Sequence, residues 1–290
     1  MSEAAPAKIN LYLHITGRRP DGLHVLDSLV VFAEIGDGVT VAPSADISLS
    51  RSGAMVAGLP PVEGDLVFRA AHRLAELTKT PGGAAIHVEK NLPVASGIGG
   101  GSADAAATIR SLLRLWSVDL TPDLQAALAE ELGADISVCL RSRPSLMAGV
   151  GEQLSSPGAL PPLYAILANP GVSVSTAEVF AAFAAAAVAS PANPPASEPW
   201  SNDPSAFIDQ LAARRNDLTS AALSLCPAIG DVLASLEAQP ECRLARMSGS
   251  GATCFGLFAT PALAQAAADR LQRDHPNWWV AATALNSDKG

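Results

Sequence analysis

The chain has 290 residues, of which 49% are apolar and 16% are charged, and its formal net charge is −9. This length allows one large domain or two, and the acidic balance without clustered Lys and Arg argues against a nucleic-acid partner. The four cysteines include no C-x-x-C pair, which argues against a zinc site. The sequence shows neither a signal pattern nor an apolar run of about 20 residues. We therefore expect a cytoplasmic protein without a membrane partner.

The first half of the chain alternates between segments with strand periodicity and segments with helix periodicity. The predicted strands are 9–15, 39–41, 47–49 and 84–88, the second and third of them forming a hairpin. The predicted helices begin at Asp65, Ser102 and Thr121, each of which is a good N-cap residue. The helix that begins at Ser102 has apolar residues at three- and four-residue steps, so one of its faces is expected to be buried.

The second half repeats this mixture after a proline-rich segment that ends at Pro162. The predicted elements are strands 163–168, 254–258 and 280–285 and helices 176–188, 204–213, 221–236 and 262–271. A proline-rich surface loop is predicted at 190–195. Strands and helices mixed without a strict βαβ repeat predict an α+β fold in two halves, 1–155 and 156–290.

The most informative segment is a glycine-rich loop between the strand 84–88 and the helix that follows it. Glycines let successive backbone N–H groups turn toward one point, and a helix N-terminus adds about half a positive charge. Together they predict a cradle for a phosphate chain, with Ser102 as N-cap and Asp104 in the first turn. The residues of this predicted cradle are Pro93, Val94, Ala95, Ser96, Gly97, Ile98, Gly99, Gly100, Gly101, Ser102 and Asp104.

The loop differs from two common phosphate-binding patterns. It lacks the Gly-Lys-Ser/Thr ending of a P-loop, and Ser102 stands where the dinucleotide fingerprint has its third glycine. A flexible turn without a ligand is the alternative, but such a turn needs neither an N-cap residue nor a helix directly after it.

Phosphoryl transfer also needs a cation near the transferred group and a base for the acceptor hydroxyl. Lys8 precedes the first predicted strand, and Asp135 follows Gly133, which ends a predicted helix. A carboxylate can accept the hydroxyl proton while a nearby ammonium keeps it ionised. An exposed lysine at a strand end and an Asx turn are the alternatives, and sequence spacing does not show that the two side chains meet.

Five segments carry a resemblance to a known family, and they are 6–11, 20–24, 93–106, 133–135 and 248–252. Together they resemble the GHMP kinase superfamily over nearly the whole chain. The Pro-Ala-Lys-x-Asn-Leu segment with the later Asp-Gly-x-His is similar to the branch that acts in the non-mevalonate isoprenoid pathway. The resemblance implies a two-domain GHMP kinase fold, with an N-terminal half like ribosomal protein S5 domain 2 and a ferredoxin-like C-terminal half.

The resemblance implies an enzyme that phosphorylates the 2-hydroxyl of a cytidine-diphosphate-linked methylerythritol. ATP is the implied cofactor, with Mg²⁺ carried by ATP and no protein ligand assigned to the metal. Asp135 would be the general base and Lys8 its electrostatic partner. The implied partner is a small-molecule substrate, and the protein would be a monomer or a homodimer.

The resemblance also implies the residues that contact the substrate. Asn10 would lie by the acceptor, His24 would hydrogen-bond to cytosine, and Thr176 and Phe180 would line the cytidine side. Leu23 stands where the family usually has a tyrosine that stacks on cytosine, so it offers apolar contact without a ring. For His24 an ordinary, partly buried histidine is the alternative.

Asp65 stands where the family usually has an asparagine that meets adenine. Its carboxylate could accept a hydrogen bond from the adenine amino group, or it could cap the helix that begins there. Two other functions stay open at this point. The chain could be another GHMP kinase, acting on homoserine, a mevalonate derivative or a sugar, or it could be a catalytically inactive nucleotide-binding regulator.

Overall fold

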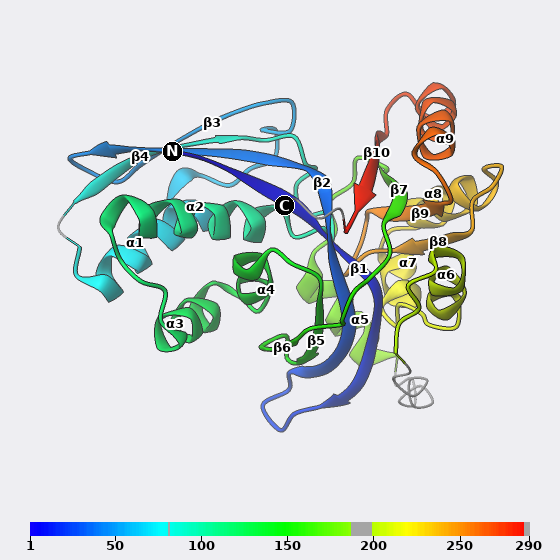
Figure 1. Cartoon of the computed structure of the whole chain (residues 1–290), viewed down its shortest axis with the longest axis horizontal. Helices are drawn as coiled ribbons and strands as arrows, with labels where there is room; N and C mark the ends of the chain where they lie inside the picture. Colours follow the sequence, from blue (N-terminus) through cyan, green and yellow to red (C-terminus); the bar gives the residue numbers. More distant parts are fainter. Residues whose placement is uncertain (81, 187–198, 287–290) are drawn as a thin grey trace. The chain divides into compact units, whose positions relative to one another are not determined.

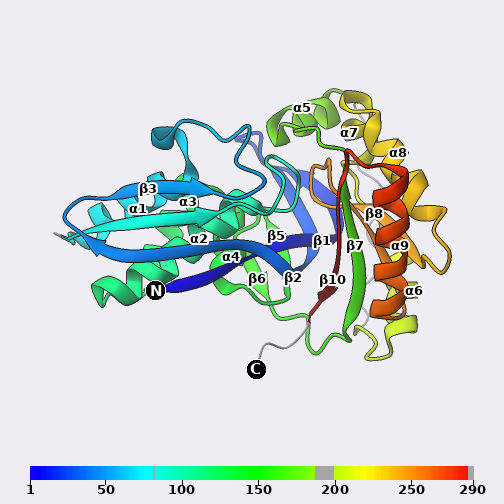
Figure 2. The same cartoon turned by 90° about the horizontal axis from the view of Figure 1, so that it is seen from above.

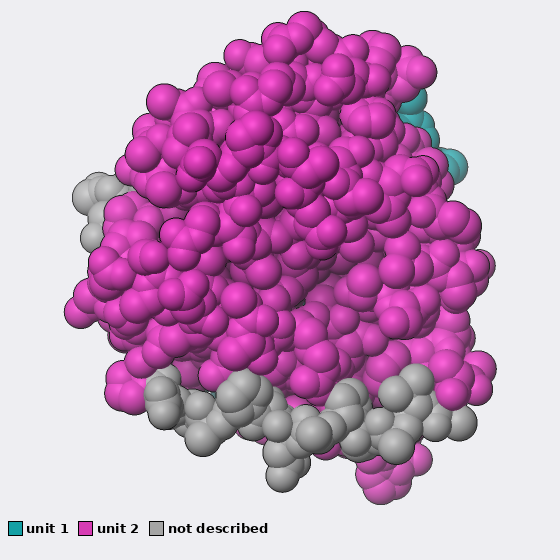
Figure 3. Space-filling view, turned by 90° about the vertical axis from the view of Figure 1, so that its right-hand side faces the viewer, with its two compact units in different colours: residues 1–8, 35–94, 99–143 teal, residues 9–34, 95–98, 144–290 magenta. Residues whose placement is uncertain are grey.

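The computed structural model describes residues 1–80, 82–186 and 199–286. The chain divides into two compact units, which Figure 3 distinguishes by colour. Unit 1 comprises residues 1–8, 35–94 and 99–143, and unit 2 comprises residues 9–34, 95–98 and 144–290. The two longest strands, β1 (Ser2–Arg18) and β2 (His24–Ser44), contribute residues to both units.

Unit 1 combines a β-sheet with helices on one of its faces (Figure 1). Its strands are the first part of β1, the second part of β2, β3 (Ser48–Ser52) and β4 (Gly83–Glu89). Its helices are the 3-10 helix η1 (Val62–Gly64), α1 (Leu66–Thr78), α2 (Gly100–Trp116), α3 (Pro122–Leu132) and α4 (Asp135–Arg141). Apolar residues were predicted on one buried face of the second long helix. Of these, Ala106, Ile109, Leu112 and Leu113 are buried, whereas Trp116 is only partly buried.

The predicted hairpin of 39–41 with 47–49 is wrong, because β4 lies between the two segments. β2 pairs antiparallel with one edge of β4, and β3 pairs parallel with the other edge. A Cβ at Gly83 would lie 2.4 Å from the carbonyl carbon of Asp46, so only glycine allows β4 to start against that connection. Periodicity predicted the strands correctly but contains no information about this third partner.

Unit 2 contains the antiparallel strands β10, β7, β9 and β8, with the first part of β2 next to β10 (Figure 2). These strands are β7 (Leu163–Asn169), β8 (Leu244–Met247), β9 (Cys254–Phe258) and β10 (Trp279–Leu285). The short strands β5 (Ser145–Gly149) and β6 (Gln153–Ser155) pair with each other, and β5 also pairs with β2. The predicted α+β class is confirmed, whereas the division into 1–155 and 156–290 stays a prediction.

The helices of unit 2 are α5 (Thr176–Ala185), α6 (Pro204–Ala212), α7 (Thr219–Leu225), α8 (Ala228–Glu237) and α9 (Pro261–Asp274). One helix was predicted for 221–236, but α7 ends before Pro227 and α8 begins after it, because proline cannot continue the backbone ladder. The helix α4 was not predicted. The predicted loop at 190–195 and the end of the predicted helix 176–188 lie outside the described residues.

Arg246 holds together three backbone segments within unit 2. Its guanidinium donates to the carbonyl oxygens of Leu11, Leu211 and Arg214 at 2.6–2.9 Å. Burial lowers the pKa of Arg246 to about 10, yet the group keeps its proton at neutral pH. The four cysteines are free. No helix in the described ranges combines the length and the apolar character that crossing a bilayer requires.

Candidate active site

The glycine loop leads directly into α2, which begins at Gly100 rather than at Ser102. Gly99 is the N-cap residue, with φ of 64°, and its carbonyl oxygen accepts from the N–H of Ala103 at 2.8 Å. The predicted N-cap role of Ser102 is therefore wrong. Gly99 takes a left-handed conformation that only glycine adopts without strain, so the chain enters the helix before any side chain can cap it.

The N-terminus of α2 is suited to binding an anion. Gly99 offers no side-chain cap, and the first turn of α2 carries no acidic side chain. The leading N–H groups of a helix have no partner within the helix and point outward from its positive end. A Cβ at Gly101 would meet no atom within 4 Å, so space is open beside this turn. The backbone therefore fits a phosphate chain.

The middle of the loop, residues 95–98, belongs to unit 2 and is held there by the segment 248–253. The Ser248 hydroxyl donates to the carbonyl oxygen of Gly97 at 3.1 Å, and the Thr253 N–H donates to that of Ser96 at 3.0 Å. A Cβ at Gly97 would lie 2.5 Å from the Ser248 carbonyl oxygen. Glycine at this position is therefore a packing requirement as well as a conformational one.

The side chains of the loop differ in exposure. Ser96 and Ile98 are buried, and Pro93 and Val94 are partly buried. Ala95 is exposed and takes a positive φ of 49°, and its carbonyl oxygen accepts from the N–H of Val174 at 3.2 Å. The loop is thus anchored at several points along its backbone.

Asn216 supports the segment that holds the loop, and sequence analysis missed this contact. Its side-chain amide donates to the carbonyl oxygens of Met247 and Gly249, both at 2.8 Å. Asn216 also accepts from the N–H of Leu218, immediately before α7. No signal in the sequence points to this contact, because the partners lie about thirty positions further along the chain.

Lys8 and Asp135 meet in unit 1. Lys8 Nζ lies 2.9 Å from Asp135 Oδ2, and 5% of the lysine side chain is exposed against 34% of the aspartate. Asp135 is the first residue of α4. The stem of Lys8 packs against the backbone of Gly99, where an added Cβ would lie 3.1 Å from Lys8 Cε. The ion pair therefore lies next to the start of α2, with its carboxylate open to solvent.

Cys139 lies one helical turn after Asp135 and faces the same region. Burial, and then the charge of Asp135, raise the pKa of the Cys139 thiol. A thiol that keeps its proton is a poor nucleophile. The thiol next to the ion pair is thus a packing group rather than a reactive one.

Asp104 and Asp65 bind protein groups in unit 1. Asp104 Oδ2 lies 2.5 Å from Lys90 Nζ, inside the protein and one turn into α2. Asp65 caps α1, since its Oδ1 accepts from the N–H of Val67 at 2.9 Å, and its Oδ2 accepts from Arg51 at 2.9 Å. The structure thus shows the N-cap that the sequence offered for Asp65, whereas the adenine contact stays a prediction.

Two of the predicted substrate residues lie near the segment 248–251 in unit 2. The Asn10 N–H donates to the Ser248 hydroxyl at 3.1 Å, and the Asn10 amide donates to Ser28 at 2.8 Å. The hydroxyls of Thr176 and Ser250 are 2.8 Å apart. Asn10 and Thr176 therefore both contact this segment.

The residues predicted to contact cytosine, His24, Phe180 and Leu23, also belong to unit 2. The ring of His24 lies 5.2 Å from the ring of Phe180 and 5.7 Å from that of Phe183. Partial burial lowers the pKa of His24, and the charge of Arg18 lowers it further, so its imidazole is neutral at neutral pH. Leu23 lies in the preceding turn with 51% of its surface exposed.

Comparisons with known proteins show which family the chain resembles. Residues 65–143 match the model of the GHMP kinases N terminal domain, and residues 201–277 match that of the GHMP kinases C terminal. A protein of Cereibacter sphaeroides named 4-diphosphocytidyl-2-C-methyl-D-erythritol kinase is 52% identical over 97% of this chain and 98% of its own. One of Paramagnetospirillum magneticum with the same name is 48% identical over 98% of each chain.

Solved structures give the same result. A crystal structure of 4-(cytidine 5'-diphospho)-2C-methyl-D-erythritol kinase has a TM-score of 0.76 and 32% identity, covering 99% of this chain and all of the other. An L. major mevalonate kinase has a TM-score of 0.72 at 14% identity, over 100% of this chain and 97% of the other, and shows the fold alone. From two matched domain models and relatives about half identical over nearly its whole length, we conclude that the chain belongs to the GHMP kinase family.

Proposed function

We propose that the chain is a kinase that transfers the γ-phosphoryl group of ATP to the 2-hydroxyl of 4-diphosphocytidyl-2-C-methyl-D-erythritol, in the non-mevalonate pathway to isoprenoid precursors. The observation that carries this proposal is the shared name of relatives that are 48–52% identical over nearly their whole length. The Lys8–Asp135 pair next to a helix that suits phosphate supports it independently.

Asp135 is the general base in this proposal. Its carboxylate accepts the proton of the 2-hydroxyl as the oxygen forms a bond to the γ-phosphorus and the bond to the bridging oxygen of ADP breaks. Lys8 pairs with the carboxylate of Asp135 and offsets negative charge that develops near the transferred group. No covalent phosphoprotein is part of this scheme.

The glycine loop holds the phosphates. The backbone N–H groups at the start of α2 donate to phosphate oxygens, which the absence of a side-chain cap at Gly99 permits. ATP supplies the phosphoryl group, and the Mg²⁺ that accompanies it offsets phosphate charge. In this proposal Asp65 accepts from the adenine amino group through a second lone pair of a carboxylate oxygen, while it keeps the bonds from Arg51 and Val67.

The cytidine side of the substrate contacts residues of unit 2. His24, neutral and placed against Phe180, hydrogen-bonds to cytosine, and Phe180 offers a ring face for stacking. Thr176 lines the cytidine side together with Phe180, and Asn10 lies by the acceptor. Leu23 gives apolar contact, so replacing it with tyrosine would tighten substrate binding by a stacking contribution of about 1–3 kcal/mol.

We also propose where and in what form the enzyme works. We propose a cytoplasmic enzyme for a small molecule that works as a monomer or a homodimer, without a nucleic-acid or membrane partner. The net charge of −9 without clustered Lys and Arg supports the absence of a nucleic-acid partner. Gel filtration with light scattering measures the assembly state directly.

The first test is ATP turnover by the purified protein with Mg²⁺, offering the cytidine-diphospho substrate beside homoserine, mevalonate and galactose. ADP formed only with the first alcohol supports the proposal. Turnover with another alcohol keeps the fold and the base but overturns the substrate. ATP binding without turnover of any alcohol would favour a nucleotide-binding regulator.

A further inference from the structure

A buried group of three charged side chains lies next to the glycine loop, wholly within unit 1. Lys90 Nζ donates to Asp104 Oδ2 at 2.5 Å and to Asp37 Oδ2. No more than 5% of any of the three side chains is exposed. Burying an ammonium with two carboxylates is costly unless good geometry and further hydrogen bonds compensate it. The transfer chemistry proposed above does not use this group.

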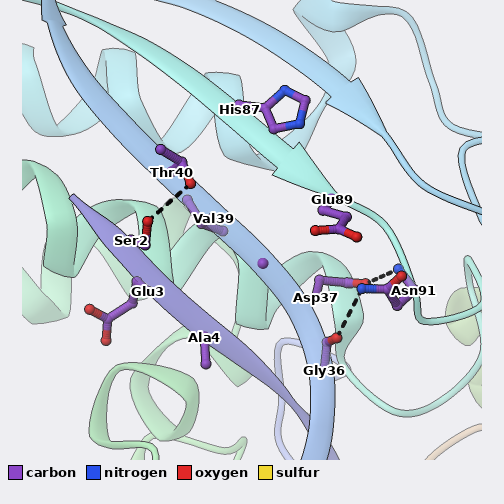
Figure 4. Close-up of a pocket in the computed structure, with 11 residues that line it drawn as sticks. Ser2, Glu3, Ala4, Gly36, Asp37, Val39, Thr40, His87, Glu89 and Asn91 are labelled. Atoms are coloured by element: carbon purple, nitrogen blue, oxygen red, sulfur yellow. Dashed lines mark hydrogen bonds between the residues drawn. The ribbon is translucent and has the colours of Figure 1, made fainter.

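The group holds the beginning of the loop through Asp37. Figure 4 shows Asp37 reaching from β2 to Asn91, beside a pocket of about 500 Å³. Asp37 Oδ1 accepts from the backbone N–H groups of Asn91 at 2.5 Å and Leu92 at 2.8 Å. Asn91 and Leu92 directly precede Pro93, the first residue of the predicted cradle, and their backbone is therefore fixed by one carboxylate.

The same group holds the end of the loop through α2. Asp104 stands one turn into that helix, and the backbone of Gly100 packs directly against the group. A Cβ at Gly100 would lie 3.7 Å from both Asp37 Oδ2 and Lys90 Nζ. The three side chains thus tie residues 90–92 to residues 100–104, and the intervening loop spans a fixed distance.

The hydrogen bonds of the two carboxyl groups also indicate which of them carries a proton. Asp37 accepts from three donors, whereas Asp104 accepts from Lys90 alone and its buried Oδ1 has no partner among the described residues. Two buried carboxyl groups beside one ammonium leave an excess negative charge, which a proton on the carboxyl with fewer donors removes. Burial raises the pKa of Asp104 far enough that the charge of Lys90 does not restore it.

We propose that Lys90, Asp37 and Asp104 form an electrically neutral staple that fixes both ends of the phosphate-binding loop before ATP arrives, with the proton on Asp104. This inference rests on the proposed function only in taking ATP phosphates as the ligand of the loop. A net negative charge beside the start of α2 would oppose a triphosphate, and a loop with free ends would lose more entropy on binding. The three are positioning residues.

The test compares Asp104→Ala with Asp104→Asn, whose amide resembles a protonated carboxyl in shape and charge. Amide hydrogen exchange over residues 94–101 is measured on the nucleotide-free protein, and Mg²⁺-ATP affinity is measured by calorimetry without any alcohol. We expect Asp104→Ala to exchange faster and to bind ATP about tenfold more weakly, while Asp104→Asn recovers most of both losses. The KM for the alcohol should change less than the ATP affinity.

The control is Glu130→Gln, which removes one negative charge from an exposed position of α3. Unchanged exchange and affinity in Asp104→Ala would overturn the staple, and an Asp104→Asn variant as weak as Asp104→Ala would overturn its neutral state. If Asp104→Ala does not fold, Asp37→Asn tests the other end of the loop. A protein that binds ATP but leaves the cytidine alcohol unchanged would refute the proposed function alone.

Discussion

Unit 1 contains two lysine–carboxylate groups, and they differ in stoichiometry and in access to water. Lys8 faces one carboxylate, that of Asp135, a third of which is exposed. Lys90 faces two carboxylates, those of Asp37 and Asp104, and all three side chains are buried. The first pair therefore leaves a carboxylate that a substrate can reach, whereas the side chains of the second group are inaccessible to a substrate.

The same two residue types thus serve different purposes according to burial. An exposed carboxylate with a single cation stays ionised and can exchange a proton with a bound hydroxyl. A buried carboxyl beside another carboxylate becomes neutral, and its role is to hold the neighbouring backbone in position. Matched substitutions in the two groups test this distinction.

The largest expected effect is on turnover in Asp135→Asn. The amide cannot accept the hydroxyl proton, so kcat should fall by about 10²–10⁴-fold. ATP affinity should stay close to that of the unchanged protein, because Asp135 lies outside the glycine loop. Measuring ADP release and ATP binding separately checks both statements, with Asp123→Asn on α3 as the control. A kcat close to the original value would remove Asp135 from its role as base.

The second comparison replaces each lysine by methionine and measures the free energy of unfolding in urea. Lys90→Met leaves Asp37 buried without its ammonium, so it should cost about 3–5 kcal/mol. Lys8→Met should cost about 1 kcal/mol, because water can reach the carboxylate of Asp135. Equal losses in the two variants would show that exposure is not what separates the groups.

The third prediction concerns pH and the proton on Asp104. Lys90 after β4, Asp37 on β2 and Cys139 on α4 are the titratable groups that face it. The folded pKa of Asp104 is raised above its ordinary value of 3.8, so ionisation in the unfolded chain alone makes stability fall as pH rises. Asp104→Asn should remove this fall. The free energy of unfolding of the variant, relative to that of the unchanged protein, should therefore rise by about 1.4 kcal/mol per pH unit above pH 4, until folded Asp104 ionises. Urea unfolding from pH 4 to 8 measures it, and a pH-independent difference would place the proton elsewhere.

The smallest expected effects come from two neighbouring glycines that each face one of the groups. Gly99→Ala should cost about 1–2 kcal/mol, because φ of 64° strains alanine and its Cβ presses on Lys8. Gly100→Ala should gain about 0.5–1 kcal/mol of folding stability, because alanine suits a helix and its Cβ only touches the buried group. Thermal unfolding of the two variants measures the difference, and the reverse order would contradict the geometry.

The sequence predicted the local elements well where one signal dominated. The glycine loop, the long amphipathic helix after it and the N-cap at Asp65 needed only nearby residues, and the structure shows all three. The start of α2 was misplaced because Ser102 has the side chain of a cap, whereas the glycines before it supplied the turn through their backbone. A strong cap residue is therefore weak evidence when glycines precede it.

Contacts between distant segments were beyond the reach of the sequence. Lys8 and Asp135 come from the first strand and the fourth helix, and only the fold brings them within 2.9 Å. The roles of these residues rested on a family resemblance and stay predictions. The Lys90 group was missed because Asp37 lies 53 positions before Lys90 and because Asp104 was assigned to the phosphate cradle. The one available signal was Asp37 between two glycines inside an apolar strand.

The discontinuous units have a consequence for synthesis on the ribosome. The strand β2 pairs through Ala33 with Leu285 of β10, so this contact forms only after β10 has been synthesised, long after β2. Until then Ala33 lacks its β10 partner, although the residues of β2 on either side of it can already pair with β4 and β5. Unit 1 needs nothing beyond Arg143, so it can form while the remainder is still being made. The pair of β2 with β10 would then form later than the sheet and helices of unit 1.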